Sequence, residues 1–171
     1  EFDNKGFRLV SSDGKRLALT ESRTVKHGSA VRLIVPPKAL TLLGRVLTEA
    51  DENVTFHFDE NQLRIATLRA VIFTRLIEGN FPDYNSVVPK SNDRHVSVSR
   101  GQLERGIRQV TPLVTDKTRA VRFTFAPGAL TLFTRSADVG EATVQIEVEC
   151  SGPEIEIVFN PDFVLEFLRN V

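Results

Sequence analysis

Two pairs of glutamates have a spacing that suits acid–base chemistry. Glu147 stands two residues before Glu149, and Glu154 stands two residues before Glu156. A two-residue step puts both carboxylates of a pair on one side of a strand, where one group can serve as an acid and the other as a base. The regular alternation of these segments already explains the spacing without catalysis. We therefore expect four surface carboxylates and no active site.

The histidines and the single cysteine form no recognisable catalytic or metal-binding pattern. His27, His57 and His95 fall in different predicted elements, and His57 alternates with phenylalanines as a surface residue of a strand does. The sequence has no His/Cys metal spacing, phosphate-binding glycine loop or nucleophile elbow. Cys150, in phase with Val148, is expected in the core or at a sheet edge. We expect no enzymatic activity, no cofactor and no metal ion.

The charges of the chain are balanced. Lysines and arginines number 22, aspartates and glutamates also number 22, and the formal net charge is zero. This balance disfavours a protein that grips nucleic acid over its whole surface, whereas local basic patches remain compatible with it. No apolar run reaches membrane-spanning length. The sequence contains no methionine, which suggests a piece of a longer polypeptide.

Hydrophobic periodicity predicts three copies of one unit, in which a strand and a helix are followed by further strands. The predicted strands cover residues 2–10, 16–20, 30–35, 54–58, 62–67, 70–77, 96–99, 121–125, 130–134, 144–149 and 155–159, with a turn at 11–14. One helix begins at Pro36-Pro37, where proline is tolerated, and the others cover 101–110 and 161–171. The strands before the helices end at Val35, Val98 and Phe159, which are 63 and 61 residues apart. Such units bury their faces by pairing with neighbours.

One arginine occupies the same position in each predicted helix. These residues are Arg45, Arg108 and Arg169. Each precedes by two residues an apolar residue that we place on the buried stripe, namely Leu47, Val110 and Val171. Two residues are about 200° round a helix, so the arginines point away from the core. They are candidates for contacts with phosphate groups, although any exposed helix face also carries arginines.

The loop after the first complete unit has an unusual composition. It reads Leu-Ile-Glu-Gly-Asn-Phe-Pro-Asp-Tyr over residues 76–84 and Val-Val-Pro over 87–89. The prolines keep the segment extended. Phe81 and Tyr84 need an apolar site, and the Tyr84 hydroxyl needs a hydrogen-bond partner. On physical grounds this loop is a connection between domains, held in place by its two aromatic residues.

This loop and a second run resemble characteristic segments of a known family. The second run reads Ser-Asp-Gly-Lys-Arg-Leu-Ala over residues 12–18, where that family has Thr-Asp-Gly, then His or Arg, then Arg-Leu-Ala. Together they resemble the bacterial DNA polymerase III beta subunit, the replicative sliding clamp. The similarity extends over nearly the whole chain, and it is specific in these two runs.

The resemblance implies an α+β protein with the DNA-clamp fold. That fold repeats strand-helix-strand-strand-strand units, with antiparallel sheets outside and helices on one face. On this basis residues 1–92 are most of the middle clamp domain, without its N-terminal part. Residues 93–171 are the first part of the C-terminal clamp domain, without its last strands and tail.

The resemblance also implies a function. Family members are non-enzymatic accessory subunits of a DNA-directed DNA polymerase holoenzyme, and they act in DNA replication in the cytoplasm. Their protomers close head to tail into a homodimer ring that encircles duplex DNA without sequence preference. A pocket between the middle and last domains binds short peptides of polymerase, clamp-loader and repair proteins. No membrane is involved.

Two sets of site residues follow from the resemblance. The predicted DNA-binding residues are Lys38, Arg45, Arg100, Arg105, Arg108 and Arg169. The predicted peptide-binding residues are Ser12, Gly14, Lys15, Arg16, Leu17, Pro82, Ser86 and Val87. Lys15 replaces the family's His or Arg, and Ser86 stands where Arg is frequent, so the charge at the rim differs. Apolar surfaces such as Leu17, Pro82 and Val87 suit a Leu or Phe side chain, while Arg16 suits a carboxylate or carbonyl.

Two other functions remain open from the residues. One is a peptide- or single-strand-binding module with the same repeat and no ring. Two features distinguish it from a ring-shaped clamp: whether the three arginines share one face, and whether strand edges pair between subunits. The other is an enzyme built on paired strand carboxylates. That enzyme requires a cleft with at least two carboxyl groups of shifted pKa.

Overall fold

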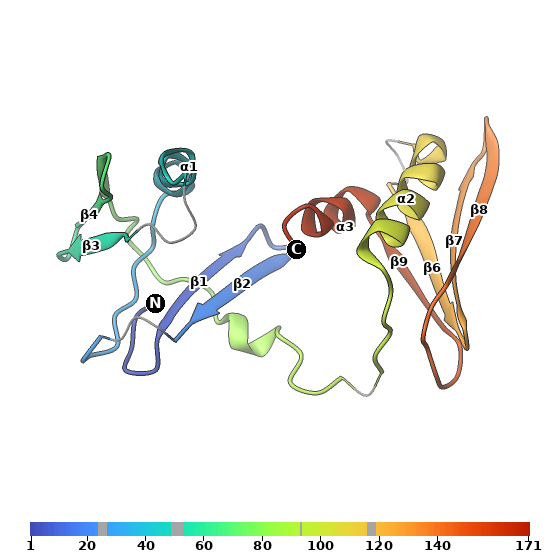
Figure 1. Cartoon of the computed structure of the whole chain (residues 1–171), viewed down its shortest axis with the longest axis horizontal. Helices are drawn as coiled ribbons and strands as arrows, with labels where there is room; N and C mark the ends of the chain where they lie inside the picture. The colour runs from blue at the N-terminus through green and yellow to red at the C-terminus, as the bar shows by residue number, and fades with distance from the viewer. Residues whose placement is uncertain (24–26, 49–52, 93, 116–118) are drawn as a thin grey trace. The chain divides into compact units, whose positions relative to one another are not determined.

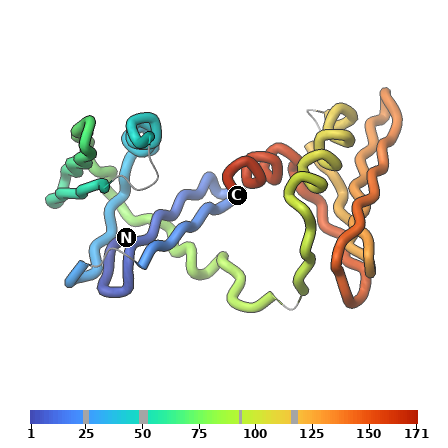
Figure 2. The backbone as a smooth tube through the Cα atoms, viewed as in Figure 1, coloured from blue at the N-terminus to red at the C-terminus, as the bar shows by residue number. Residues whose placement is uncertain are grey.

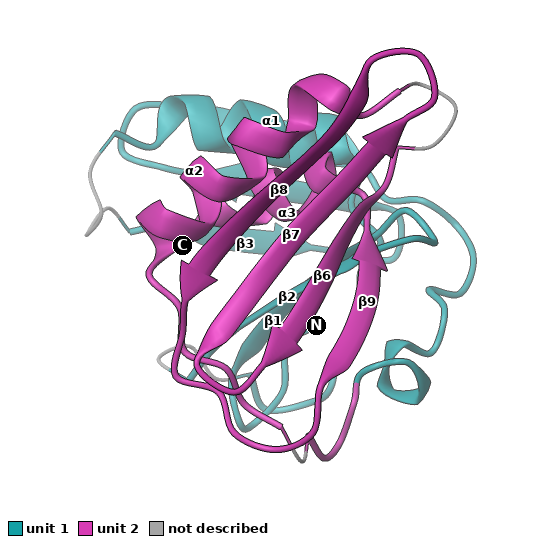
Figure 3. Ribbon diagram, turned by 90° about the vertical axis from the view of Figure 1, so that its right-hand side faces the viewer, with its two compact units in different colours: residues 1–88 teal, residues 89–171 magenta. Residues whose placement is uncertain are grey.

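The computed structural model describes residues 1–23, 27–48, 53–92, 94–115 and 119–171. The chain forms two compact units, residues 1–88 and residues 89–171, coloured teal and magenta in Figure 3. Each unit has a hydrophobic core of its own.

Unit 1, residues 1–88, combines a hairpin, a helix and a small sheet (Figure 1). Its elements are β1 (Phe7–Ser12), β2 (Leu17–Ser22), α1 (Pro37–Val46), β3 (Thr55–Phe58), β4 (Gln62–Ala66), β5 (Val71–Arg75) and the 3-10 helix η1 (Tyr84–Ser86). β1 pairs with β2, and β3, β4 and β5 form a sheet in that order. All of these pairings are antiparallel.

Alternation along the strands decides which side of the small sheet is buried. Leu63 and Ile65 of β4 are buried, whereas the residues beside them are at least partly exposed. Leu43 of α1 belongs to the same hydrophobic cluster as these two residues, as the helical spacing of apolar residues predicts. His57 of β3 is exposed, which confirms its expected surface position.

Unit 2, residues 89–171, is a four-stranded antiparallel sheet with its helices on one face (Figure 3). Its elements are α2 (Arg100–Val110), the 3-10 helix η2 (Thr111–Leu113), β6 (Val121–Ala126), β7 (Ala129–Ser136), β8 (Gly140–Glu147), β9 (Ile155–Phe159) and α3 (Pro161–Leu168). The strand order is β8-β7-β6-β9, so β9 of the third copy pairs with the first strand after α2. The predicted α+β class is therefore confirmed.

The core of unit 2 lies between the sheet and its helices. Ile107 of α2 and Leu132 of β7 are fully buried there. Gly106 lets α2 approach the sheet closely, because a Cβ at this position would lie 2.8 Å from Ile146 Cδ1 and 3.0 Å from Leu132 Cδ1. Cys150 is partly buried against the same core, as expected for a core or edge cysteine.

Two predicted strands are wrong. Residues 30–35 form only an isolated bridge at Val31, opposite Phe2, and residues 96–99 form only a bridge between Ser97 and Glu149. Their apolar composition fits a strand, but no described strand lies alongside them to complete a ladder. In the third copy the strand before the helix, β9, does form, because it pairs along its whole length with the edge of β6.

The start and the turn of the first hairpin also differ from the prediction. Strand β1 begins at Phe7 because Asp3 and Gly6 close a turn before it, with Asp3 N–H donating to Gly6 O at 2.9 Å. The turn between the strands falls at residues 13–16 instead of 11–14, and β1 continues to Ser12. An aspartate that binds the amides ahead of it explains this shift.

The helical repeat agrees with the predicted spacing. Helices α1, α2 and α3 begin at residues 37, 100 and 161, which are 63 and 61 residues apart. Helix α3 ends at Leu168 instead of continuing to Val171, and Val171 is 58% exposed. The placement of Val171 on a buried stripe is therefore wrong, since no helical turn carries it back to the core.

Candidate functional site

The turn between β1 and β2 is organised by Asp13. Its Oδ1 accepts hydrogen bonds from the N–H groups of Lys15 and Arg16, both at 3.0 Å, and its Oδ2 lies 3.0 Å from Arg16 Nε. Gly14 has φ +82°, a conformation that glycine adopts without strain. Ser12 Oγ accepts from the Gly14 N–H at 3.2 Å and donates to Arg16 O at 3.0 Å. Four of the predicted peptide-binding residues are thus fixed by the turn, and all four are exposed.

The turn should loosen in acid. The Lys15 N–H bond and the Arg16 side chain hold the pKa of Asp13 below its usual value, which is about 3.9 in model peptides. A lowered folded-state pKa contributes stability that is present above the unfolded pKa and is lost as the pH falls through the folded pKa. In an NMR titration, we expect the Lys15 and Arg16 amide resonances to shift together as the pH falls through the lowered, folded-state pKa of Asp13.

The matched variant for this titration is Asp13→Asn. It keeps an oxygen acceptor but has no charge to titrate, so the Lys15 and Arg16 amides should stay unchanged over the same acid range. Titration of Asp13 at the ordinary pKa in the wild type would contradict the expectation.

The second segment with predicted site residues is the loop before and after η1. Residues 76–83 follow an irregular path without helix or strand (Figure 2). Asp83 caps η1, with Oδ1 accepting from Asn85 N–H at 3.1 Å, while Ser86 Oγ donates to Asp83 O at 2.7 Å. Pro82 and Ser86 are exposed, and Val87 is 68% exposed.

Tyr84 anchors this loop to unit 1. Its side chain is buried, and its hydroxyl donates to Glu1 Oε2 at 2.7 Å. Arg8 Nη1 donates to the Tyr84 oxygen at 3.4 Å and to Glu1 Oε2 at 3.3 Å. The hydrogen bond with Tyr84 is the main cause that raises the pKa of Arg8. The expectation that Tyr84 is an anchor with a hydrogen-bonded hydroxyl is confirmed.

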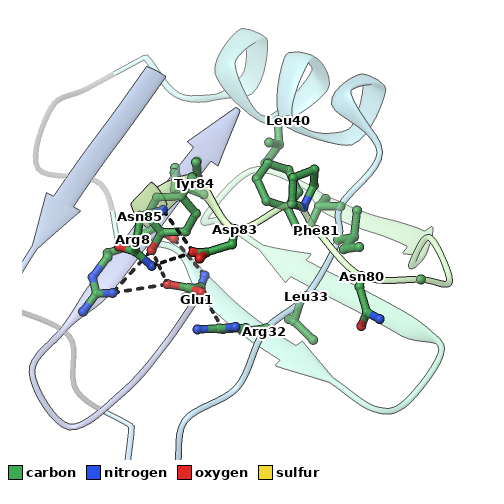
Figure 4. A pocket seen from close by; sticks show the side chains of 16 residues that line it. Glu1, Arg8, Arg32, Leu33, Leu40, Asn80, Phe81, Asp83, Tyr84 and Asn85 are labelled. Carbon is green, nitrogen blue, oxygen red and sulfur yellow. Dashed lines mark hydrogen bonds and ion pairs between the residues drawn. The ribbon is translucent and has the colours of Figure 1, made fainter. Parts of the chain in front are cut away.

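A pocket of about 430 Å³ lies beside the anchored loop (Figure 4). Leu40 and Phe81 lie together at one end, whereas Glu1, Arg8 and Tyr84 gather at the other. Its apolar part suits a hydrophobic side chain, and its polar part is already engaged in internal hydrogen bonds. An apolar recess beside polar groups that are already paired suits the binding of a small apolar group.

Of the eight predicted peptide-binding residues, Pro82 lines this pocket, which is also lined by Leu9 and Val10 of β1. The other seven are not part of its lining. Leu17, which opens β2 opposite Ser12, is half-buried. The structure therefore places the eight residues in two segments of one unit, and their common role stays a prediction.

Three predicted DNA-binding residues of unit 2 act on one carboxylate, that of Glu104, and one of them, Arg108, binds it directly. Glu104 Oε1 accepts from Arg108 Nε at 3.1 Å and from Arg108 Nη2 at 2.8 Å. This bond first, and then the positive charges of Arg108, Arg100 and Arg169, lower the pKa of Glu104. The α2 and α3 helices pack together, which explains why the charge of Arg169 acts on this carboxylate. Arg105, the fourth candidate, is exposed on α2.

The arginine equivalence holds in the structure. Arg45, Arg108 and Arg169 each come eight residues after the first residue of their helix, and all three are exposed. Lys38 is exposed in the first turn of α1. A basic side chain at a helix C-terminus also stabilises the helix dipole, so exposure is compatible with both a structural and a binding role.

The described residues contain no group of three or more His, Cys, Asp or Glu side chains that could hold a metal ion. All four glutamates of the two i, i+2 pairs are exposed, and Glu156 forms an ion pair with Arg122 at 3.2 Å. These positions agree with solvated strand faces. In the part of the chain that the structure covers, no helix has the length and apolar character needed to cross a bilayer.

Comparison with protein families assigns both halves of the chain. Residues 1–83 match the family model of the DNA polymerase III beta subunit, central domain, and residues 85–171 match that of the DNA polymerase III beta subunit, C-terminal domain. The chain belongs to the DNA polymerase III beta-subunit family. The resemblance seen in the two sequence runs is thereby confirmed.

Relatives in the beta-subunit family agree with this assignment. A beta sliding clamp of Pseudomonas putida is 31% identical over 169 residues, which are 98% of this chain and 46% of that protein. A DNA polymerase sliding clamp from Pseudomonas aeruginosa, solved with a ligand, has a TM-score of 0.92 at 30% identity, with 98% and 46% coverage. A P. aeruginosa clamp bound to griselimycin has a TM-score of 0.90 at 31% identity, with the same coverage. The DNA-clamp fold is confirmed, and the chain spans about half the length of the curated relatives it matches.

Sequence reasoning on this beta-subunit chain missed three residues that organise the candidate sites. Glu1 and Arg8 bind Tyr84, and Glu104 binds Arg108. The i, i+4 spacing of Glu104 and Arg108 was a usable signal, because such pairs meet on a helix. The partners of Tyr84 lie 83 and 76 residues away, and no local pattern indicates them.

Proposed function

We propose that this chain is part of a polymerase processivity factor, a sliding clamp that encircles duplex DNA. The observation that carries the proposal is the succession of two beta-subunit domains in family order along one chain. The clamp itself is non-enzymatic and acts as an accessory subunit of the DNA-directed DNA polymerase holoenzyme in the cytoplasm. Its protomers form a head-to-tail homodimer ring, in which residues 1–92 belong to the middle domain and 93–171 to the C-terminal domain.

We further propose that the turn and the loop of unit 1 form the docking site for partner peptides. Ser12, Gly14, Lys15, Arg16 and Leu17 are presented by one segment, and Pro82, Ser86 and Val87 by the other. The exposure of Val87 and of the turn residues leaves them accessible to a partner, and the support for a docking role is the resemblance of the two runs to the family. Relatives from P. aeruginosa and Bartonella birtlesii have been solved bound to griselimycin, which supplies a probe.

The ring proposal is tested by topology. The polypeptide that contains this chain is loaded on nicked circular duplex DNA, and the circle is then cut. A clamp held by encirclement is retained on the circle and lost when the DNA becomes linear. Equal retention on both forms indicates direct binding and overturns the ring proposal, leaving a binding module without a ring.

The helix arginines should determine how strongly the binding constant for duplex DNA depends on salt concentration. Replacing Arg45, Arg108 and Arg169 by glutamine removes three candidate partners of DNA phosphates. The slope of log K against log salt should become less steep by about 0.9 for each phosphate that is no longer neutralised. Binding measured at several salt concentrations on the same duplex gives this slope.

A matched triple variant controls for the loss of positive charge. Arg75, Arg122 and Arg135 are also exposed but lie on strands, and their replacement by glutamine should leave the slope nearly unchanged. An equal change in both variants would show that net charge, and not the helix positions, determines binding.

A further inference from the structure

Tyr84 is unlike the residues around it. It is 7% exposed, whereas Pro82, Asp83, Asn85 and Ser86 are all exposed. A buried aromatic ring in an otherwise exposed segment fixes the position of its neighbours. Tyr84 also begins η1, which leads directly to Ser86 and Val87.

The hydroxyl of Tyr84 enters a network of charged groups. Glu1 Oε2 accepts from both Tyr84 and Arg8, while Glu1 Oε1 lies 2.6 Å from Arg32 Nε. Arg8 is itself held by Asp3 at 3.2 Å and by Glu21 at 3.1 Å. Hydrogen bonds to ionised groups are stronger than neutral ones. The end of the loop at Tyr84 is therefore tied to β1 and β2 through several charge-assisted interactions.

The preceding part of the loop has less support. Phe81 and Pro82 line the pocket of about 430 Å³ instead of a filled core, and Phe81 is seen there in Figure 4. Empty space provides no packing partners to define a backbone position. Because this side is open, we expect the conformation of residues 81–84 to depend on the network at Tyr84.

We propose that the Tyr84 hydroxyl, acting through Glu1 and Arg8, is a positioning group that holds Pro82, Ser86 and Val87 in the arrangement that binds a peptide. This inference rests on the proposed docking function. The residue touches no ligand in this role; it reduces the number of loop conformations, and so lowers the ordering cost that binding would otherwise incur.

Tyr84→Phe tests the proposal, because it keeps the ring and removes only the hydroxyl. Griselimycin is the probe, and its dissociation constant is measured by calorimetry with the whole chain. We expect about a tenfold or larger loss of affinity, the size associated with one charge-assisted hydrogen bond. Thr67→Val is the matched control, since it removes another partly buried, hydrogen-bonded hydroxyl of unit 1, in the turn after β4. It should leave the dissociation constant unchanged.

A spectroscopic readout separates positioning from general destabilisation. Tyr84 is the single tyrosine and the chain has no tryptophan, so tyrosine fluorescence reports this site alone. Glu1→Ala should change the emission of the free protein. If Tyr84 acts through Glu1, the double variant Glu1→Ala/Tyr84→Phe binds griselimycin no more weakly than Glu1→Ala does.

The outcomes separate the two proposals. If the wild-type chain does not bind griselimycin, the docking proposal fails. If it binds and Tyr84→Phe binds equally well, or if Thr67→Val weakens binding as much, the docking site stands and the positioning role of Tyr84 is overturned. Additive losses in the double variant would also overturn it, because the two residues would then act independently.

Discussion

Leu132→Ala should lower the free energy of unfolding by about 2–5 kcal/mol, as expected for a fully buried leucine. Leu132 is 0% exposed in β7 and packs beneath α2, where Gly106 brings the helix close. The removal of packed methyl groups and the cavity left behind both contribute to the cost. Because unit 2 has a separate core, the loss should be confined to its unfolding transition, measured by urea denaturation of the chain.

Leu68→Ala provides the matched comparison. Leu68 is 89% exposed in the turn between β4 and β5, so the same chemical change removes almost no packing. Its cost should stay within about 0.5 kcal/mol. Similar losses in the two variants would show that the sheet and helix of unit 2 are not packed as described.

Gly6→Ala should be the most damaging small substitution in unit 1. Gly6 has φ +154°, and a Cβ there would lie 2.2 Å from the backbone oxygen of Ser22. A backbone atom of a paired strand has little freedom to move, so β1 and β2 must separate or the turn with Asp3 must open. We expect a loss of about 3 kcal/mol or more, above the range for backbone strain alone, measured by urea denaturation.

Gly79→Ala separates the two causes of that loss. Gly79 also has a positive φ, +124°, but nothing lies within 4 Å of a Cβ placed on it. The Gly79→Ala variant should lose only the free energy that backbone strain costs, about 1 kcal/mol of unfolding free energy. Equal costs at the two positions would mean that the close approach to Ser22 has no energetic effect.

Local patterns predicted the helices and most strands, because the period at which apolar residues recur indicates both the type of element and its buried side. The spacing of α1, α2 and α3 is one example, and the buried stripe of β4 is another. The predicted strands at 30–35 and 96–99 failed for a different reason. Whether an apolar extended segment becomes a strand depends on a neighbouring edge, and that information lies elsewhere in the chain.

The candidate sites also contain some features that local sequence determines and others that depend on distant parts of the chain. The turn at Asp13 and the exposed helix arginines depend on interactions within a few residues or on helical geometry. The sequence therefore predicted the exposed arginines and a turn that contains Asp13, although it placed that turn two residues too early. Glu1 and Arg8 were missed because they meet Tyr84 only after the chain has folded. The assignment of peptide-binding residues came from resemblance to a family. From the residues alone, the helix arginines fitted a structural or a binding role, and the loop with Phe81 and Tyr84 was expected to be a structural connection.

The pairing of β9 with β6 has a consequence for the order of folding. Phe159 pairs with Val121, so the sheet of unit 2 is complete only when strands from two successive copies have met. During synthesis, β6 exposes an unpaired edge until β9 has left the ribosome, and such edges are prone to pair with other chains. Non-local strand pairs also form slowly. We expect β9 to dock late. The nascent chain should therefore be most prone to aggregation in the interval between the synthesis of β6 and the synthesis of β9.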